Sequence, residues 1–544
     1  MDANETFEKL ADEALKQFLD ENPVWATFLG FHDPYDRLLS DGSIEQVYEN
    51  LRLMDEWLEK IRKTVDFDAL DEEHKVDWKL LENAYERFKF SAYEERAHEK
   101  NPEALQDIGA MIFVVLTREY APFEKRIEGI VARLEKLPVY LEQFRKSFEK
   151  CIPVKLWTEI AIEQCQQMPG YFQFLLTVTK GKVSEELYQR LQGANVSLSQ
   201  QLSQHLEWLK ALLPKAKADW VLGKDKFEKL LELRELGMTS EEIYQLGVTS
   251  LRELKQERAK LAEQISPGKT AKEVLTQIQA EAPKTFEEAL KFTRSEIERA
   301  KAFVIEHDIA AIPEEGQLHV RETPSFMAPL IPFAAMVLPG KYEKTQEGIY
   351  IVTRPKNMED MGKHANYASI PNTAVHEAYP GHFLQTSCSN RVGSFIRNIG
   401  GGIETAEGWA HYCEEMMMDH GFQGGMKSKF MQVNAMITRA VRIIVDVKLS
   451  RGEMSLEEAV NMLMGEAGMP KDGAIAEVRR YTQSPGYPLS YLLGKHLMLK
   501  LRDEVKTKMG SSYSDRCFHD VIVANGYLPI SKLRRIFEHK LGDL

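Results

Sequence analysis

The sequence predicts a mainly α-helical protein with one small antiparallel β element. Apolar residues recur at three- and four-residue steps along most of the chain, which is the period of an amphipathic helix. Side chains that cap helices stand at the start of several of these runs. Only residues 310–355 combine frequent prolines with short β-branched runs, a pattern that favours strands over long helices.

The N-terminal part shows the helical period clearly. The first apolar stripe consists of Phe7, Leu10, Ala14, Leu15 and Phe18. Asn22 and Pro23 end this helix, because proline cannot continue a helical hydrogen-bond ladder. Amphipathic runs over residues 43–61 and 71–97 predict two further long helices.

Three helix starts are predicted in the next part of the chain. The stretches 184–186, 239–242 and 285–288 each begin with Ser or Thr and end with two glutamates, so a side-chain oxygen can cap the first turn and the acids favour its dipole. Residues 251–265 are rich in charge and predict a long exposed helix or a helical hairpin.

Strands are expected only within residues 310–355. The segments 318–320 and 348–352 are short and rich in β-branched residues. Long helices are excluded there by Pro313, Pro324, Pro329, Pro332 and Pro339. Helices return after the glycines at 400–402, a predicted flexible junction, over residues 426–451, 455–466, 472–482 and a last pair around 513–541.

Composition limits the classes of function. The net charge of −13 argues against nucleic acid as a partner, because binding phosphates requires basic patches. No stretch has the roughly 18 apolar residues of a membrane span, so no membrane partner is expected. The N-terminus lacks the pattern of a signal peptide, and the odd, scattered cysteines read as free thiols, so a cytoplasmic location is expected. They are Cys151, Cys165, Cys388, Cys413 and Cys517.

Two neighbouring stretches carry the residue types of a zinc-hydrolase site. The first contains His376, Glu377 and His382, and the second, residues 404–414, contains a helical Glu. Two neutral imidazoles and one carboxylate bind Zn²⁺ and leave a position for water, while a Glu beside the first His takes a proton from that water. The pattern predicts one Zn²⁺ per chain, with Glu377 as general base.

The spacing of the two histidines requires a break in the helix. His376 and His382 are six residues apart, whereas two histidines four apart would share one helix face. Pro380 has no N–H for the helical ladder, and Gly381 can take backbone angles that other residues avoid. We therefore expect a bulge or break there that returns His382 to the side of His376.

The third ligand has three candidates on one predicted helix. Glu404, Glu407 and His411 follow one another at steps of three and four and so share a face. Glu407 is favoured because Gly408 beside it lets another backbone approach closely, and His411 is the next choice. Glu414 lies on nearly the same face and is expected to accept a hydrogen bond from a ligand histidine.

These motifs resemble a known family. The pattern His-Glu-Ala-x-Pro-Gly-His from residue 376, followed by Glu-Gly-Trp-Ala from residue 407, resembles the family catalogued as domain of unknown function 885, which is grouped with the zincin-like metallopeptidases. Residues 23–30 resemble the opening of that family and residues 480–494 its late motif, so the similarity covers nearly the whole chain.

The resemblance implies a large helical zincin-like body with a deep cleft that admits short peptides. Related helical zincins use Tyr or Arg late in the chain to stabilise the oxyanion, which by motif match selects Tyr491 and Arg480, with Tyr487 as a further candidate. A strand next to the metal helix would pair with an extended substrate. His364 and Asn366 are weaker candidates for lining the cleft, and His496 has no argument beyond its position.

The sequence therefore predicts a zinc metallopeptidase, acting as an oligopeptidase or a carboxypeptidase. A carboxypeptidase needs a cation for the terminal carboxylate, and Arg479, Arg480 and Arg321 are equal candidates. Two alternatives are a metal-dependent amidase or esterase acting on another metabolite, and a non-catalytic helical binding protein. The oligomeric state is open, with a homodimer among the alternatives.

The absence of a clear linker favours a single unit over residues 1–544. The alternative is two lobes around a cleft. A helical lobe would then comprise residues 1–300, and a second lobe, residues 301–544, would carry the metal motif.

Overall fold

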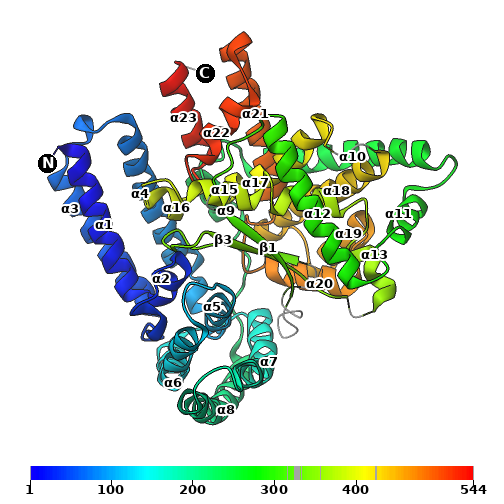
Figure 1. Cartoon of the computed structure of the whole chain (residues 1–544). Helices are drawn as coiled ribbons and strands as arrows, with labels where there is room; N and C mark the ends of the chain where they lie inside the picture. Colours follow the sequence, from blue (N-terminus) through cyan, green and yellow to red (C-terminus); the bar gives the residue numbers. More distant parts are fainter. Residues whose placement is uncertain are drawn as a thin grey trace. The chain divides into compact units, whose positions relative to one another are not determined.

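The computed structural model of the chain describes residues 2–314, 316–323, 331, 334–355, 357–422 and 425–542, and most of it is helical, as predicted (Figure 1). It divides into two compact units. Unit 1 comprises Met1–Trp220 and Pro339–Gln346, and unit 2 comprises Val221–Leu338 and Glu347–Leu544. The two-lobe alternative placed the boundary at residue 300, whereas the compact units divide at residue 220.

Unit 1 is helical. Its α-helices are α1 (Ala3–Glu21), α2 (Pro23–Leu29), α3 (Gln46–Thr64), α4 (Glu72–Phe90), α5 (Gln106–Thr117), α6 (Phe123–Ser147), α7 (Lys155–Thr179) and α8 (Glu185–Leu212). Pro23 opens α2, so α1 ends where predicted. The Ser184 hydroxyl accepts a hydrogen bond from the N–H of Leu187, which confirms the predicted cap of α8. Apolar residues of α5 to α8 form the main core of this unit.

Unit 2 carries the strands and the other helices. Its helices before the metal motif are α9 (Lys224–Leu233), α10 (Ser240–Ile265), α11 (Ala271–Ala280), α12 (Phe286–Glu306) and α13 (Met361–His364). Thr239 and Thr285 accept hydrogen bonds from the N–H groups of Glu242 and Glu288, which confirms both predicted caps. Residues 251–265 are the second half of α10, one long helix and not a hairpin.

The predicted metal motif and the residues after it form ten helices in the described part of the chain. These are α14 (Ile370–Glu377), α15 (His382–Ser389), α16 (Ile396–Ile399), α17 (Ile403–Asp419), α18 (Met426–Arg451), α19 (Leu456–Ala467), α20 (Lys471–Tyr481), α21 (Ser490–Met509), α22 (Asp515–Val523) and α23 (Ile530–Leu541). The glycines at 400–402 are not a loose junction, because the N–H of Gly402 donates to the carbonyl of Tyr527 at 2.6 Å.

The sheet is mixed, which corrects the antiparallel prediction. Its described strands, β1 (Gln317–Glu322), β2 (Ala334–Val337) and β3 (Glu347–Val352), lie in the order β1–β3–β2. β2 pairs with β3 in antiparallel fashion, but β1 runs parallel to β3 on its other side. Strand β2 was missed because prolines surround it. Of those that were expected to exclude helices, Pro324, Pro329 and Pro332 lie outside the described residues.

Close backbone approaches position the elements of the motif. A Cβ atom added to Gly348 of β3 would lie 2.5 Å from the Phe383 ring of α15, so the strand packs directly on that helix. α12 packs along β1 (Figure 1) and also against α14. A Cβ atom added to Gly408 of α17 would lie 2.4 Å from the carbonyl carbon of Gly494 of α21, which confirms the predicted close approach at Gly408. None of the described helices is long and apolar enough to span a bilayer.

Candidate metal centre

The helix that carries His376 breaks as the proline and glycine predict. α14 ends at Glu377 and α15 begins at His382. The N–H of Gly381 donates to the carbonyl of Val375 at 3.0 Å, and an added Cβ atom would lie 1.8 Å from the carbonyl oxygen of His376. Trp409 of α17 donates its indole N–H to the carbonyl of Pro380 at 2.8 Å. The break is therefore a packed turn that only glycine fits at residue 381.

This turn brings the predicted ligands together. The ring centroids of His376 and His382 are 4.8 Å apart, and Nε2 of His382 lies 3.5 Å from Oε2 of Glu407. One potential ligand atom from each of His376, His382 and Glu407 lies within 4.8 Å of the others. Their side chains are only 12–17% exposed, so a bound ion would be largely shielded but still reachable.

Glu414 lies behind His376 as expected for a residue that orients a ligand. Its Oε1 accepts a hydrogen bond from Nδ1 of His376 at 2.8 Å, and its Oε2 accepts one from Asn372 at 2.9 Å. Because Nδ1 of His376 is the donor in this contact, its Nε2 is left with a lone pair for a metal. Burial opposes ionisation of Glu414, but the contacts with His411 and His376 hold its pKa well below the usual value.

Among the described residues, only one ring nitrogen of His411, Nε2, has a hydrogen-bond partner. The guanidinium of Arg439 donates from Nε to Nε2 of His411 at 3.3 Å, so the proton of the neutral ring lies on Nδ1, which is 3.0 Å from Oε1 of Glu414. Burial lowers the pKa of His411 to about 3. His376, His411 and Glu414 form a second cluster with ligand atoms within 4.8 Å, in which Nδ1 of His411 is buried without a hydrogen-bond partner.

Glu407 is the better placed of the two acidic candidates on α17. Glu404 is buried in an ion pair with Arg234. Glu407 instead faces the two histidines, and its Oε1 accepts a hydrogen bond from the hydroxyl of Tyr487 at 3.1 Å. Burial would raise the pKa of Glu407, but the contact with His382 outweighs it and lowers the pKa to about 2. Glu407 is thus an anion held beside His382.

Glu377 ends α14 next to the ligand cluster. Its side chain is half-buried, and its charge adds to the dominant effect of burial in raising the pKa of Tyr350 on β3. Among the residues that the structure describes, no hydrogen bond or ion pair engages its carboxylate. A carboxylate that no protein group engages can accept a proton from a reactant.

The late-chain residues predicted to support the oxyanion form a layer beside Glu407. Tyr487, the third choice, makes the direct contact with Glu407. The hydroxyl oxygen of Tyr491 lies 3.5 Å from that of Tyr487, and its ring centroid lies 5.6 Å from that of His411. The guanidinium carbon of Arg480 lies 5.6 Å from the ring centroid of Tyr487. Tyr491 and Arg480 are therefore neighbours of the cluster, with Tyr487 nearest to it.

Helix α18 contributes three charged residues that the sequence analysis missed. Arg439 contacts His411, and Arg442 donates to the hydroxyl of Tyr481 at 2.9 Å. Asp446 accepts hydrogen bonds from the N–H groups of Gly486 and Leu489 at 2.9 and 3.0 Å, which fixes the loop before α21. Their spacing of three and four residues within the mostly apolar stretch 435–447 of this helix was the available signal.

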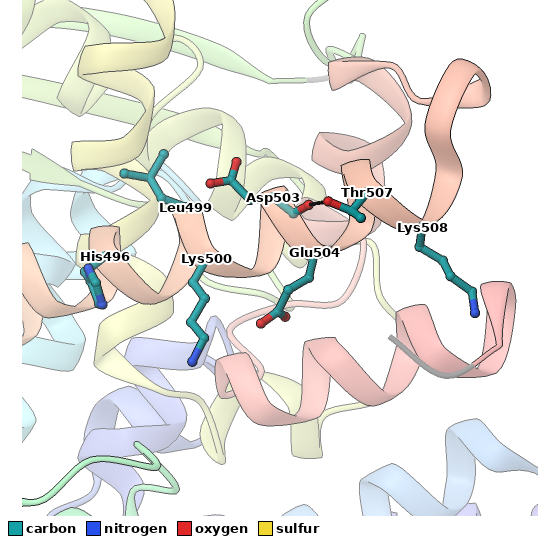
Figure 2. Close-up of a pocket in the computed structure, with 7 residues that line it drawn as sticks. All are labelled: His496, Leu499, Lys500, Asp503, Glu504, Thr507 and Lys508. Carbon is teal, nitrogen blue, oxygen red and sulfur yellow. Dashed lines mark hydrogen bonds between the residues drawn. The ribbon is translucent and has the colours of Figure 1, made fainter.

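The weaker candidates lie elsewhere. Asn366 does not line the site, since its amide oxygen accepts hydrogen bonds from the N–H groups of Ala368 and Ser369 and so shapes the turn before α14. His364 ends α13. Figure 2 shows His496 beside Lys500 in a pocket along α21, and none of the predicted ligands lines that pocket.

Comparisons with known proteins agree with this architecture. The family model described as bacterial protein of unknown function (DUF885) matches residues 23–536. A solved structure from Shewanella oneidensis, a proposed lipoprotein of unknown function, is 21% identical with a TM-score of 0.79, over 97% of this chain and 99% of that one. Another from Colwellia psychrerythraea, also a proposed lipoprotein, is 19% identical with a TM-score of 0.85, over 99% of both chains. No curated protein matches.

Proposed function

We propose that this chain, which belongs to the family described as bacterial protein of unknown function (DUF885), is a zinc-dependent hydrolase that cleaves peptide bonds in short peptides. The observation that carries the proposal is the convergence of His376, His382 and Glu407 across a broken helix, with Glu414 behind His376. Two imidazoles, one carboxylate and a carboxylate-oriented histidine are the donor set of catalytic zinc sites.

The residues fit this ion in number and kind. His376, His382 and Glu407 would hold Zn²⁺, with Glu414 fixing the tautomer of His376 and Tyr487 holding Glu407. A set of three protein ligands leaves a position open, as a catalytic site requires. When bound, Zn²⁺ supplies a Lewis acid that polarises the scissile carbonyl and lowers the pKa of water.

The protein's own groups carry the proton transfers. Glu377, adjacent to His376 in the chain, would take the proton of the attacking water and pass it to the leaving amine. Tyr491 or Arg480 would donate a hydrogen bond to the developing oxyanion. The half-buried position of Glu377 favours this exchange because water is partly excluded around it.

The sheet limits where an extended peptide could add a strand. β3 is paired on both sides, so it has no free edge for a substrate. The outer strands β1 and β2 each have one edge facing away from β3. A substrate strand would therefore pair with β1 or β2.

Metal analysis and peptide cleavage test the proposal together. Purified protein should contain about one zinc per chain, and His382→Ala should lose it. Zinc-loaded protein should cleave members of a short-peptide panel, whereas Glu377→Gln should keep its zinc and lose cleavage. Cleavage of small amides or esters without peptides would favour the amidase alternative, and protein that lacks zinc after zinc-replete purification would refute the coordination scheme.

The cellular location needs its own measurement. The scattered free cysteines are the basis for expecting the cytoplasm. Two similar structures are described as proposed lipoproteins, a description that points to the cell envelope for those proteins. Fractionation of cells that express the natural gene, followed by immunodetection, distinguishes the two locations.

A further inference from the structure

Two arginines beside the ligand cluster share one counter-ion. Nη2 of Arg442 and Nη2 of Arg480 both donate to Oε2 of Glu477, each at 3.0 Å, and the hydroxyl of Tyr481 donates to the same oxygen at 2.6 Å. The group therefore holds two guanidinium cations and one carboxylate, a local charge of one positive unit. The side chains of Arg442 and Glu477 are only 14% and 25% exposed, so water screens this charge incompletely.

The arginine pair has donors to spare. A guanidinium carries five N–H groups. Among the described residues, Nε and Nη1 of Arg480 and Nη1 of Arg442 have no protein acceptor. Arg480 is also 42% exposed, so its unused edge can be reached from solvent. A partly desolvated cation with unused N–H donors is an arrangement that binds a carboxylate through charge-assisted hydrogen bonds.

Two tyrosines connect the pair to the ligand cluster. The guanidinium of Arg480 lies 5.6 Å from the ring centroid of Tyr487, whose hydroxyl contacts Glu407. The guanidinium of Arg442 lies 4.9 Å from the ring centroid of Tyr491. About one tyrosine side chain therefore separates the cations from a metal ligand. An extended peptide, at about 3.4 Å per residue, covers such a span with one or two residues.

We propose that Arg480 and Arg442 bind the C-terminal carboxylate of a peptide, which makes the enzyme a carboxypeptidase that removes one or two residues. This inference rests on the proposed peptidase function. A substrate carboxylate balances the second guanidinium, as Glu477 balances the first. The other cations fit less well, because Arg439 donates to His411 and to the carbonyl of Ala435, and Arg321 lies exposed on β1.

Peptide binding to an inactive variant tests the carboxylate site without using activity. Zinc-loaded Glu377→Gln protein would be titrated calorimetrically with one tetrapeptide bearing either a free C-terminal carboxylate or a carboxamide. The free acid should bind about 10- to 100-fold more tightly, which is the usual effect of a hydrogen-bonded charge pair. The added change Arg480→Gln should remove this preference, Arg480→Lys should restore part of it, and Arg321→Gln should leave it intact.

The outcomes separate this inference from the proposed function. Equal affinities for the two peptides, no binding of either at millimolar concentration, or a preference lost with Arg321→Gln and kept with Arg480→Gln would each overturn the carboxylate site. Cleavage of blocked and free peptides at equal rates by the wild type would leave a peptidase standing and remove only the carboxypeptidase assignment. Selective binding without any cleavage would instead keep the carboxylate site and refute the hydrolase.

Discussion

Replacement of Glu414 by glutamine tests whether this residue orients a metal ligand. The carboxylate is 2% exposed and accepts hydrogen bonds from His376 and Asn372 through its two oxygens. Glutamine has the same shape but one acceptor oxygen and no charge, so either His376 or Asn372 loses its partner. Loss of such a carboxylate behind a ligand histidine weakens metal binding by roughly 10- to 100-fold. Zinc affinity would be measured by competition with a chromophoric chelator at pH 7.5.

The neighbouring Glu415 provides a matched control. It also lies on α17, but it pairs with Lys495 and does not touch the ligand cluster, so Glu415→Gln should bind zinc as the wild type does. Unchanged zinc affinity in a folded Glu414→Gln protein would refute the orienting role. Complete loss of zinc would show that Glu414 is itself a ligand, with His376 and His411, and the coordination scheme proposed above would be wrong.

Four further substitutions test separate parts of the structure. Gly381→Ala places a Cβ atom 1.8 Å from the carbonyl of His376, so zinc content should be lost and the melting temperature should fall. Tyr487→Phe removes the hydrogen bond to Glu407 and should lower zinc affinity several-fold in chelator competition. Tyr491→Phe should keep zinc affinity and lower kcat by roughly 100-fold. The reverse pattern would exchange the roles of the two tyrosines. Burial of His205 lowers its pKa to about 3, so the unfolded state binds an extra proton below pH 6.5 and stability is lost as pH falls. Between pH 7.5 and pH 5 this residue should lower the free energy of unfolding by about 2 kcal/mol. In denaturant unfolding, the His205→Gln variant should show a pH dependence that is smaller by this amount.

The sequence predicts helices well here because their signals are local. The stop at Pro23 and the caps at Ser184, Thr239 and Thr285 depend on residues within one helical turn, and all of them appear in the structure. The sheet depends on pairing between distant segments. Strand β2 has only four residues and takes its place from β3, so its own sequence could not reveal it or show that β1 runs parallel.

In the candidate site too, features set by local sequence were predictable and those set by distant contacts were not. The break between His376 and His382 was predictable because Pro380 and Gly381 limit their own backbone. The roles of Arg439 and Arg442 were not, because nothing in their local sequence shows that α18 lies beside the turn before α21. Their partners, His411 and Tyr481, lie on other helices, and only the fold brings them together.

The position of Glu407 relative to Tyr487 and Tyr491 is fixed by close backbone contacts between their helices. Gly408 directly follows Glu407, and it meets Gly494 of α21 so closely that neither residue has room for a side chain. Tyr491 lies in the first turn of α21, and Tyr487 lies in the loop just before it. Asp446 of α18 holds that loop by accepting hydrogen bonds from its backbone. Backbone contacts of this kind leave little freedom for rotamer changes to alter the spacing between helices. Glu407 and the hydroxyl of Tyr487 are therefore held at hydrogen-bond distance without an ion or substrate, which is the preorganisation that the proposed hydrolytic site would require.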